Sequence, residues 1–152
     1  MKKPISGPFF VGAWALALAV MFAGCRSAPT PEEAALKLLQ GSWEGEGPGG
    51  RASLTISGNS LHFRARPDFW YETTLTFPAG PDLPQFHAAI TRQSGVEQAD
   101  VGKVVVSLYK IEGENLTLGV VDDYAEPPAS TVPGNWDRVT DTFSFKRAPA
   151  LP

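Results

Sequence analysis

Apolar and polar residues alternate along most of the chain after Gly41, which is the pattern of half-buried β-strands. In RASLTI (51–56) every second residue is apolar, and the same holds for LHFRAR (61–66) after the turn signal SGNS (57–60). Six further segments alternate in a similar way or are apolar on both faces. The expected strands are 42–46, 51–56, 61–66, 69–77, 86–90, 103–111, 116–121 and 142–147.

One short helix is expected before these strands. Thr30 is suited to cap a helix that begins with Pro31, and Glu33 completes a T-x-x-E capping box. Gly41 can end the helix in a left-handed backbone conformation. The helix and the first strand therefore meet at this glycine.

Short strands at hairpin spacing predict an antiparallel meander. Polar loops are expected at 93–100 and, at greater length, at 122–140. A meander of eight strands has two free edges, and closing into a barrel removes them. We therefore predict an all-β fold over residues 32–148: an eight-stranded antiparallel up-and-down barrel with one short N-terminal helix.

The N-terminal segment does not belong to this fold. Lys2 and Lys3 precede an uncharged apolar run, FFVGAWALALAVMF (9–22), and the only cysteine follows at position 25. The run is shorter than the roughly 20 residues that span a bilayer, so it is typical of a secretory signal peptide rather than of a permanent transmembrane helix. We predict a signal peptide over residues 1–24.

Phe22-Ala23-Gly24-Cys25 resembles the bacterial lipobox, in which two small residues precede the cysteine. The resemblance implies cleavage before Cys25, a diacylglyceryl thioether on its sulfur, and a membrane as partner through this anchor. Residues 25–31 then form a short lipidated linker. We expect the protein in the bacterial cell envelope, at the outer membrane, facing the periplasm or the cell surface.

Charge and composition exclude several classes of partner. The 152 residues carry a net charge of −3, and removal of residues 1–24 with their two lysines leaves 128 residues and a charge of −5. This acidic balance gives no reason to expect a nucleic-acid partner. One cysteine cannot form an internal disulfide, and the two histidines do not stand in a metal-binding spacing.

The sequence carries no motif for catalysis. It has no G-x-S-x-G elbow and no glycine-rich phosphate loop before a helix, and its cysteine is expected to be acylated. Asp122, Asp123 and Glu126 form one acidic cluster without EF-hand spacing, and we expect a solvated loop there rather than a calcium site. We predict a non-enzymatic protein without metal or cofactor.

Four segments resemble a lipocalin-like domain family found mainly in planctomycete and related bacteria. They are LQGSW (39–43), LTISGNSLHF (54–63), YKIEGENLTL (109–118) and FSFKR (143–147). Gly41-Ser42-Trp43 also looks like the lipocalin G-x-W signature, whose tryptophan closes one end of the barrel and stacks on a basic residue near the last strand. The resemblance gives this role to Trp43 together with Arg147, or with Lys146. A guanidinium on the Trp43 ring adds a cation–π contact of about 0.5–2 kcal/mol.

Aromatic residues at expected strand-to-loop junctions are candidates for contacts with a ligand at the barrel mouth. Tyr71 shares the period of the apolar residues of its strand, so we expect it in the core. Trp70 lies on the opposite face of that strand, and Tyr124 and Trp136 lie in the long loop. These three residues are the candidate ligand-binding residues.

Two functions from different classes stay open. The first is a membrane-anchored monomer whose barrel binds a small apolar or amphipathic ligand. The second is an inhibitor-like protein-interaction or envelope-assembly module, with a filled barrel core and the loop 122–140 as its contact surface. A filled interior is a serious alternative because many large residues are expected to point inward. They are Phe63, Tyr71, Phe77, Phe86, Leu108, Phe143 and Phe145.

Overall fold

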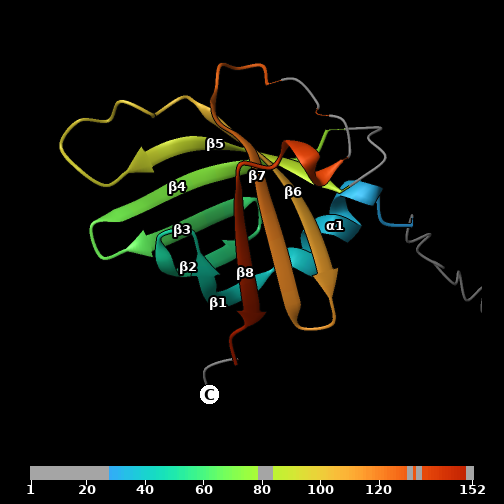
Figure 1. Cartoon of the computed structure of the whole chain (residues 1–152). Helices are drawn as coiled ribbons and strands as arrows, with labels where there is room; N and C mark the ends of the chain where they lie inside the picture. The colour runs from blue at the N-terminus through green and yellow to red at the C-terminus, as the bar shows by residue number, and fades with distance from the viewer. Residues whose placement is uncertain (1–27, 79–83, 130–131, 133–134, 150–152) are drawn as a thin grey trace, which may run out of the picture.

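Eight antiparallel strands form a closed barrel in which each strand pairs with its neighbours in the chain (Figure 1). The computed structural model describes residues 28–78, 84–129, 132 and 135–149. Because β8 pairs with β1 and completes the ring, the predicted all-β up-and-down barrel is confirmed. The strands are β1 Gly41–Gly47, β2 Gly50–Ser57, β3 Ser60–Arg66, β4 Phe69–Thr76, β5 Gln85–Gln93, β6 Val104–Glu112, β7 Asn115–Ala125 and β8 Asp141–Arg147.

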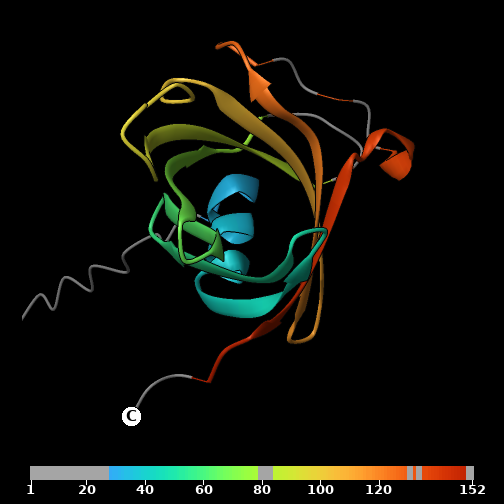
Figure 2. The same ribbon diagram turned by 60° about the vertical axis from the view of Figure 1, so that its left-hand side comes forward.

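The short helix α1, Pro31–Leu39, lies across one end of the barrel, as Figure 2 shows. The Thr30 side chain accepts a hydrogen bond from the Glu33 N–H at 3.2 Å, and the Glu33 carboxylate accepts one from the Thr30 N–H at 2.8 Å. This capping box confirms the predicted start of the helix. Leu39 is fully buried at its end, whereas Leu38 is 58% exposed.

The seam between β1 and β8 depends on two glycines. Gly45 lies opposite Phe145, and a Cβ at position 45 would collide with the carbonyl oxygen of Ser144. At Gly47 the aromatic ring of Phe143 occupies the space that a side chain would need. β8 therefore approaches β1 closely enough to close the barrel only because β1 carries glycine at these positions.

Apolar side chains from every strand fill much of the barrel interior. They form one continuous cluster together with Leu39 of α1. One representative from each strand, in chain order, is Trp43, Leu54, Leu61, Leu75, Phe86, Tyr109, Leu116 and Phe145.

A second apolar layer lies on the outside of the barrel, over β5, β6 and β7. Leu108 is fully buried there, between Gln85 and Gly119 on the neighbouring strands. The chain after β7 covers this face: the Gln85 side chain exchanges two hydrogen bonds with the backbone of Val132, at 3.1 and 3.2 Å, and Trp136 packs on Gly119. The prediction that Leu108 points inward is therefore wrong. Because β6 is covered on both faces, its residues are apolar on both faces, and the sequence does not indicate which face is the inner one.

β7 is longer than predicted. The expected strand was 116–121, followed by a loop over 122–140, whereas β7 continues to Ala125 and a 3₁₀ turn, Trp136–Arg138, lies within the loop. Irregular pairing with β6 around Val106 lets the strand continue. Residues 122–125 consequently belong to the barrel wall and not to a free loop.

The predicted signal peptide, Cys25 and the first part of the linker lie outside the described residues. Within the part of the chain that the structure describes, none of the helices has the length and apolar character needed to cross a bilayer.

Candidate functional site

The end of the barrel under α1 is closed by Trp43. Its side chain is fully buried, and its indole N–H donates a hydrogen bond to the carbonyl oxygen of Leu39 at 2.9 Å. The guanidinium of Arg147 lies over the indole, with 4.0 Å between Cζ and the ring centroid. Arg147, and not Lys146, is therefore the basic residue that stacks on this tryptophan.

Arg147 also fastens the end of α1. Its Nη1 donates to the carbonyl oxygen of Gln40 at 2.5 Å, and its Nη2 donates to that of Leu38 at 2.9 Å. The last carbonyls of a helix have no partner within the helix and carry partial negative charge. A guanidinium therefore stabilises them both by donating hydrogen bonds and by its positive charge. One side chain thus joins the last strand, the first strand and the helix.

Gly41 makes this arrangement possible. Its φ of +110° is unfavourable for any residue with a Cβ, and a Cβ there would stand 3.1 Å from Nη1 of Arg147. Next to it, the Gln40 side-chain amide exchanges hydrogen bonds of 2.8 and 2.9 Å with the backbone of Gly58 in the β2–β3 turn. The G-x-W sequence therefore has a physical basis in this chain, independent of any family.

The opposite, open half of the barrel contains a cavity of about 140 Å³. Phe69 and Asp141 begin their strands at this end, Tyr124 lies near the end of β7, and all three line the cavity. The remaining wall is mostly apolar and comes from β2 to β8. The polar residues of the lining are Thr73, Ser107, Tyr71, Tyr124, Asp123 and Asp141.

Aromatic rings form a large part of this wall. Phe63 meets Phe143 edge to face, with ring centroids 5.2 Å apart, and Phe69 meets Tyr71 in the same way at 5.0 Å. Such pairs hold the rings in fixed orientations, so the cavity presents a rigid apolar surface. A wall of this kind suits an aromatic ring or a short alkyl group.

Two tyrosine hydroxyls provide the main polar contact inside the open half. The oxygen atoms of Tyr71 and Tyr124 lie 2.9 Å apart and share a hydrogen bond. Burial, the hydrogen bond to Tyr124, and the nearby Asp100 and Asp123 raise the pKa of Tyr71 above its usual range. The Tyr71 hydroxyl therefore stays protonated at neutral pH, and the hydroxyl pair offers a ligand both a donor and an acceptor.

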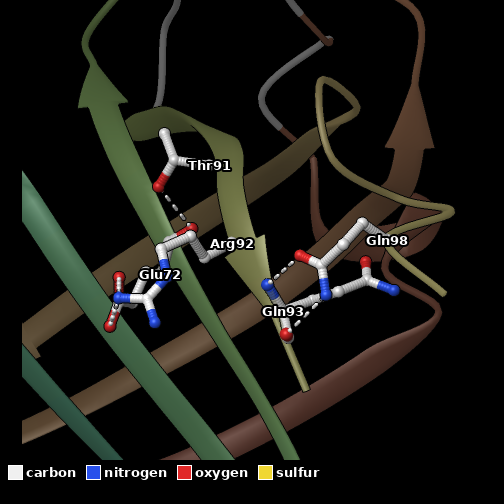
Figure 3. A network of polar contacts seen from close by, with 5 residues as sticks. All are labelled: Glu72, Thr91, Arg92, Gln93 and Gln98. Atoms are coloured by element: carbon white, nitrogen blue, oxygen red, sulfur yellow. Dashed lines mark hydrogen bonds and ion pairs between the residues drawn. The ribbon is translucent and has the colours of Figure 1, made fainter. Parts of the chain in front are cut away.

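The loop between β5 and β6 forms part of the rim and is tied down by hydrogen bonds (Figure 3). The Gln93 N–H donates to the Gln98 side chain at 3.3 Å, and the Gln98 side chain donates back to the Gln93 carbonyl at 3.1 Å. The Gln93 side-chain oxygen also accepts from the Asp100 N–H at 3.1 Å. On the adjacent outer face, Arg92 pairs with Glu72 at 3.0 Å. This side of the entrance therefore has a defined shape.

The structure separates the three candidate ligand-binding residues. Tyr124 lines the cavity, as its place near the mouth requires. Trp70 instead stacks on His62 on the outside of the wall, with ring centroids 5.8 Å apart, under the guanidinium of Arg92. Trp136 packs on the outer face of β7. Neither tryptophan is among the described residues that line the cavity.

Two acidic residues of the cavity were missed from the sequence. The sequence predicts a solvated loop at Asp123, although this residue lies in β7, and Asp141 belongs to no recognisable motif. The alternation of β8 contains the missing signal, because Asp141 has the same parity as Phe143 and Phe145, which face the interior. A carboxylate in phase with core residues at the start of a strand marks a rim position.

The two histidines lie away from the cavity. His62 is on the outer face with Trp70, and His87 is buried in the outer apolar layer, where burial lowers its pKa. Across residues 28–149, apart from the segments not described, no three His, Cys, Asp or Glu side chains group together in a way that could hold a metal ion.

Comparison with known proteins gives no match: no family model, no curated protein and no solved structure is similar to the chain. The barrel and its cavity therefore carry the structural information about function.

Proposed function

We propose that this chain is a non-enzymatic, membrane-anchored lipoprotein whose lipocalin-like barrel binds a small apolar or amphipathic molecule. The observation that carries the proposal is the cavity of about 140 Å³ in the open half of the barrel. An eight-stranded barrel either fills its interior with side chains or leaves room for one small ligand. A closed end and a hollow, mostly apolar open half fit the second case.

The lining supports a ligand with a large apolar part. Phe63, Phe69 and Phe143 offer ring surfaces, and the Tyr71–Tyr124 pair offers one polar anchor point. This combination of apolar walls with few polar groups is characteristic of small-molecule sites. Among the described residues that line the cavity, no nucleophile is hydrogen-bonded to a base that would activate it for hydrolysis or transfer.

The membrane anchor is argued from the sequence alone. The apolar run 9–22 and the lipobox-like residues before Cys25 predict removal of residues 1–24 and lipid on the new N-terminal cysteine. An intact-mass measurement of protein extracted from bacterial membranes tests this. We expect a mass lower by residues 1–24 and higher by the lipid. A Cys25→Ala variant is expected to keep residues 1–24 and carry no lipid, and lipid on that variant would disprove the anchor.

Native mass spectrometry of the protein extracted from its own envelope tests ligand binding. We expect the wild-type barrel to carry a small molecule. Ala88→Leu places a larger side chain in the cavity, because Ala88 lines it and is buried, and we expect this variant to lose the added mass. Ala89→Leu is the matched control, since Ala89 lies next in β5 on the outer face. No added mass on the wild type, or equal occupancy in both variants, would contradict the proposal.

The competing proposal is a protein-interaction or envelope-assembly module. It is favoured by apolar side chains exposed on the β5–β6 loop, where Val96 is fully exposed and Val101 is 41% exposed. Contact surfaces are often marked by exposed apolar groups. The same native spectra distinguish the two functions, because a partner of this kind appears as a second protein at fixed stoichiometry. The cavity speaks against the filled core that this module was expected to have.

A further inference from the structure

We infer that the ligand of this cavity is a small organic cation, with an apolar body inside the barrel and a positively charged amine at the mouth. The inference rests on the proposed function and names the chemical class of its ligand. Among the described residues that line the cavity, the charged ones are Asp123 and Asp141. The described part of the lining therefore contains two acidic residues and no lysine or arginine.

These carboxylates are available to a ligand. The ion pairs found among the described residues are Arg92–Glu72, Lys103–Glu126 and Lys110–Glu112, and none involves Asp123 or Asp141. Asp123 and Asp100 also lie near enough to Tyr71 to raise the pKa of its hydroxyl, so these two carboxylates contribute a negative potential at the mouth. A cationic group gains from this potential, whereas a carboxylate or phosphate would be repelled.

Among the described residues, no lysine or arginine at this end of the barrel lines the cavity. Lys103 at the rim is paired with Glu126. Arg66 lies over the ring of Phe69, 5.6 Å from its centroid, and with Arg64 it lines a separate hollow beside β2 and β3. These cations are therefore not among the residues that line the cavity, although Arg66 contacts Phe69, which does line it.

The volume limits the size of the apolar body. A dry cavity of about 150 Å³ holds a molecule the size of benzene, and the cavity here has about 140 Å³. One aromatic ring or a short branched alkyl group fits it. A tether of one or two carbon atoms then carries the amine toward the two carboxylates at the mouth.

The test uses the full chain in lipid nanodiscs and three probes of similar size: benzylamine, benzyl alcohol and benzoate. Binding is followed by the methyl NMR signals of Leu54, Leu61 and Leu118, which line the cavity and report occupancy independently of uptake of the probe by lipid. Titrations of the wild type are compared with the double variant Asp123→Asn/Asp141→Asn. Asp68→Asn is the control, because Asp68 is exposed in the β3–β4 turn at the same end and does not line the cavity.

We expect benzylamine to bind the wild type about tenfold more tightly than benzyl alcohol, the difference that one hydrogen bond to a charged group provides. The double variant should lose this preference while binding benzyl alcohol as before, and Asp68→Asn should keep the preference. Equal affinity for the two probes, or tighter binding of benzoate, overturns the inference but leaves the proposed function standing. If no probe shifts the cavity methyl signals, the proposed function fails as well.

Discussion

Replacing Arg147 by methionine should destabilise the barrel, because this side chain joins three elements at the closed end. The variant keeps an apolar stem of similar length but removes the guanidinium that stacks on Trp43 and donates to Gln40 and Leu38. We therefore compare its unfolding with that of the wild type by urea denaturation, followed by tryptophan fluorescence. Lys146→Met, one position earlier on β8, is the matched control.

The magnitude follows from the contacts. The cation–π contact is worth about 0.5–2 kcal/mol, and a hydrogen bond from a charged group about 1.5–3 kcal/mol when it is buried. The bond to Gln40 is partly buried, whereas the one to Leu38 is exposed, so water replaces the second at little cost. We expect Arg147→Met to lower the free energy of unfolding by about 2–4 kcal/mol in total.

Two further variants test whether the guanidinium of Arg147 is what stabilises the closed end. Arg147→Lys should fall between wild type and Arg147→Met, since an ammonium keeps the charge but cannot reach both carbonyls while it stacks. Lys146→Met should change stability by less than about 0.5 kcal/mol, as is usual for exposed positions. If Arg147→Met lost no more than Lys146→Met, the closed end would not depend on the guanidinium, and our account of it would be wrong.

Three other substitutions test separate parts of the structure. Gly119→Ala places a Cβ 2.7 Å from the Trp136 ring, so acrylamide should quench tryptophan fluorescence more strongly, and stability should fall by about 1–3 kcal/mol; unchanged quenching would contradict the packing. Gly45→Ala collides with the Ser144 carbonyl, so the amide protons along the β1–β8 seam should lose protection from hydrogen exchange, while those of β3–β4 stay protected. Burial lowers the pKa of His87 below its usual value of 6.5, so in acid the unfolded chain binds a proton at this residue that the folded chain does not bind. The free energy of unfolding should therefore fall as the pH drops below 6.5, and it should fall less in the His87→Leu variant. Equal slopes in urea titrations would contradict this last point.

The barrel could be predicted because local and global signals agree. In β2 and β3 the alternation of apolar residues, the turn at Gly58 with its φ of +58°, and the observed pairing of Leu54 with Phe63 all specify the same hairpin. The capping box at Thr30 similarly defines where α1 begins. Where each strand has its own alternation of apolar residues and its own turn signal, the order of the strands can be predicted without knowledge of contacts between distant segments.

The outer layer could not be predicted, because it depends on a contact between segments far apart in the chain. Leu108 is apolar whether β6 is covered on one face or on both, and nothing local indicates that Val132 and Trp136 fold back over it. The same ambiguity misplaced Trp136, which has the composition of a ligand contact and packs instead on Gly119. The packing partner of an aromatic residue in a loop, such as Trp136, cannot be identified until the position of the opposing residue, here Gly119, is known.

The cavity is the part that depends most on strand register. Phe86 pairs with Ser107 and Ala88 pairs with Val105, so Ala88 and Ser107 become diagonal neighbours on the inner face of β5 and β6. Two small side chains that meet in this way leave a hollow, although the sequence lists enough large inward residues to fill a barrel. Since a single bulge would exchange these neighbours, counting large residues cannot tell a filled interior from a hollow one. The residues that create the cavity are therefore small ones. They belong to no chemical motif, and they matter because their side chains leave space in the barrel interior.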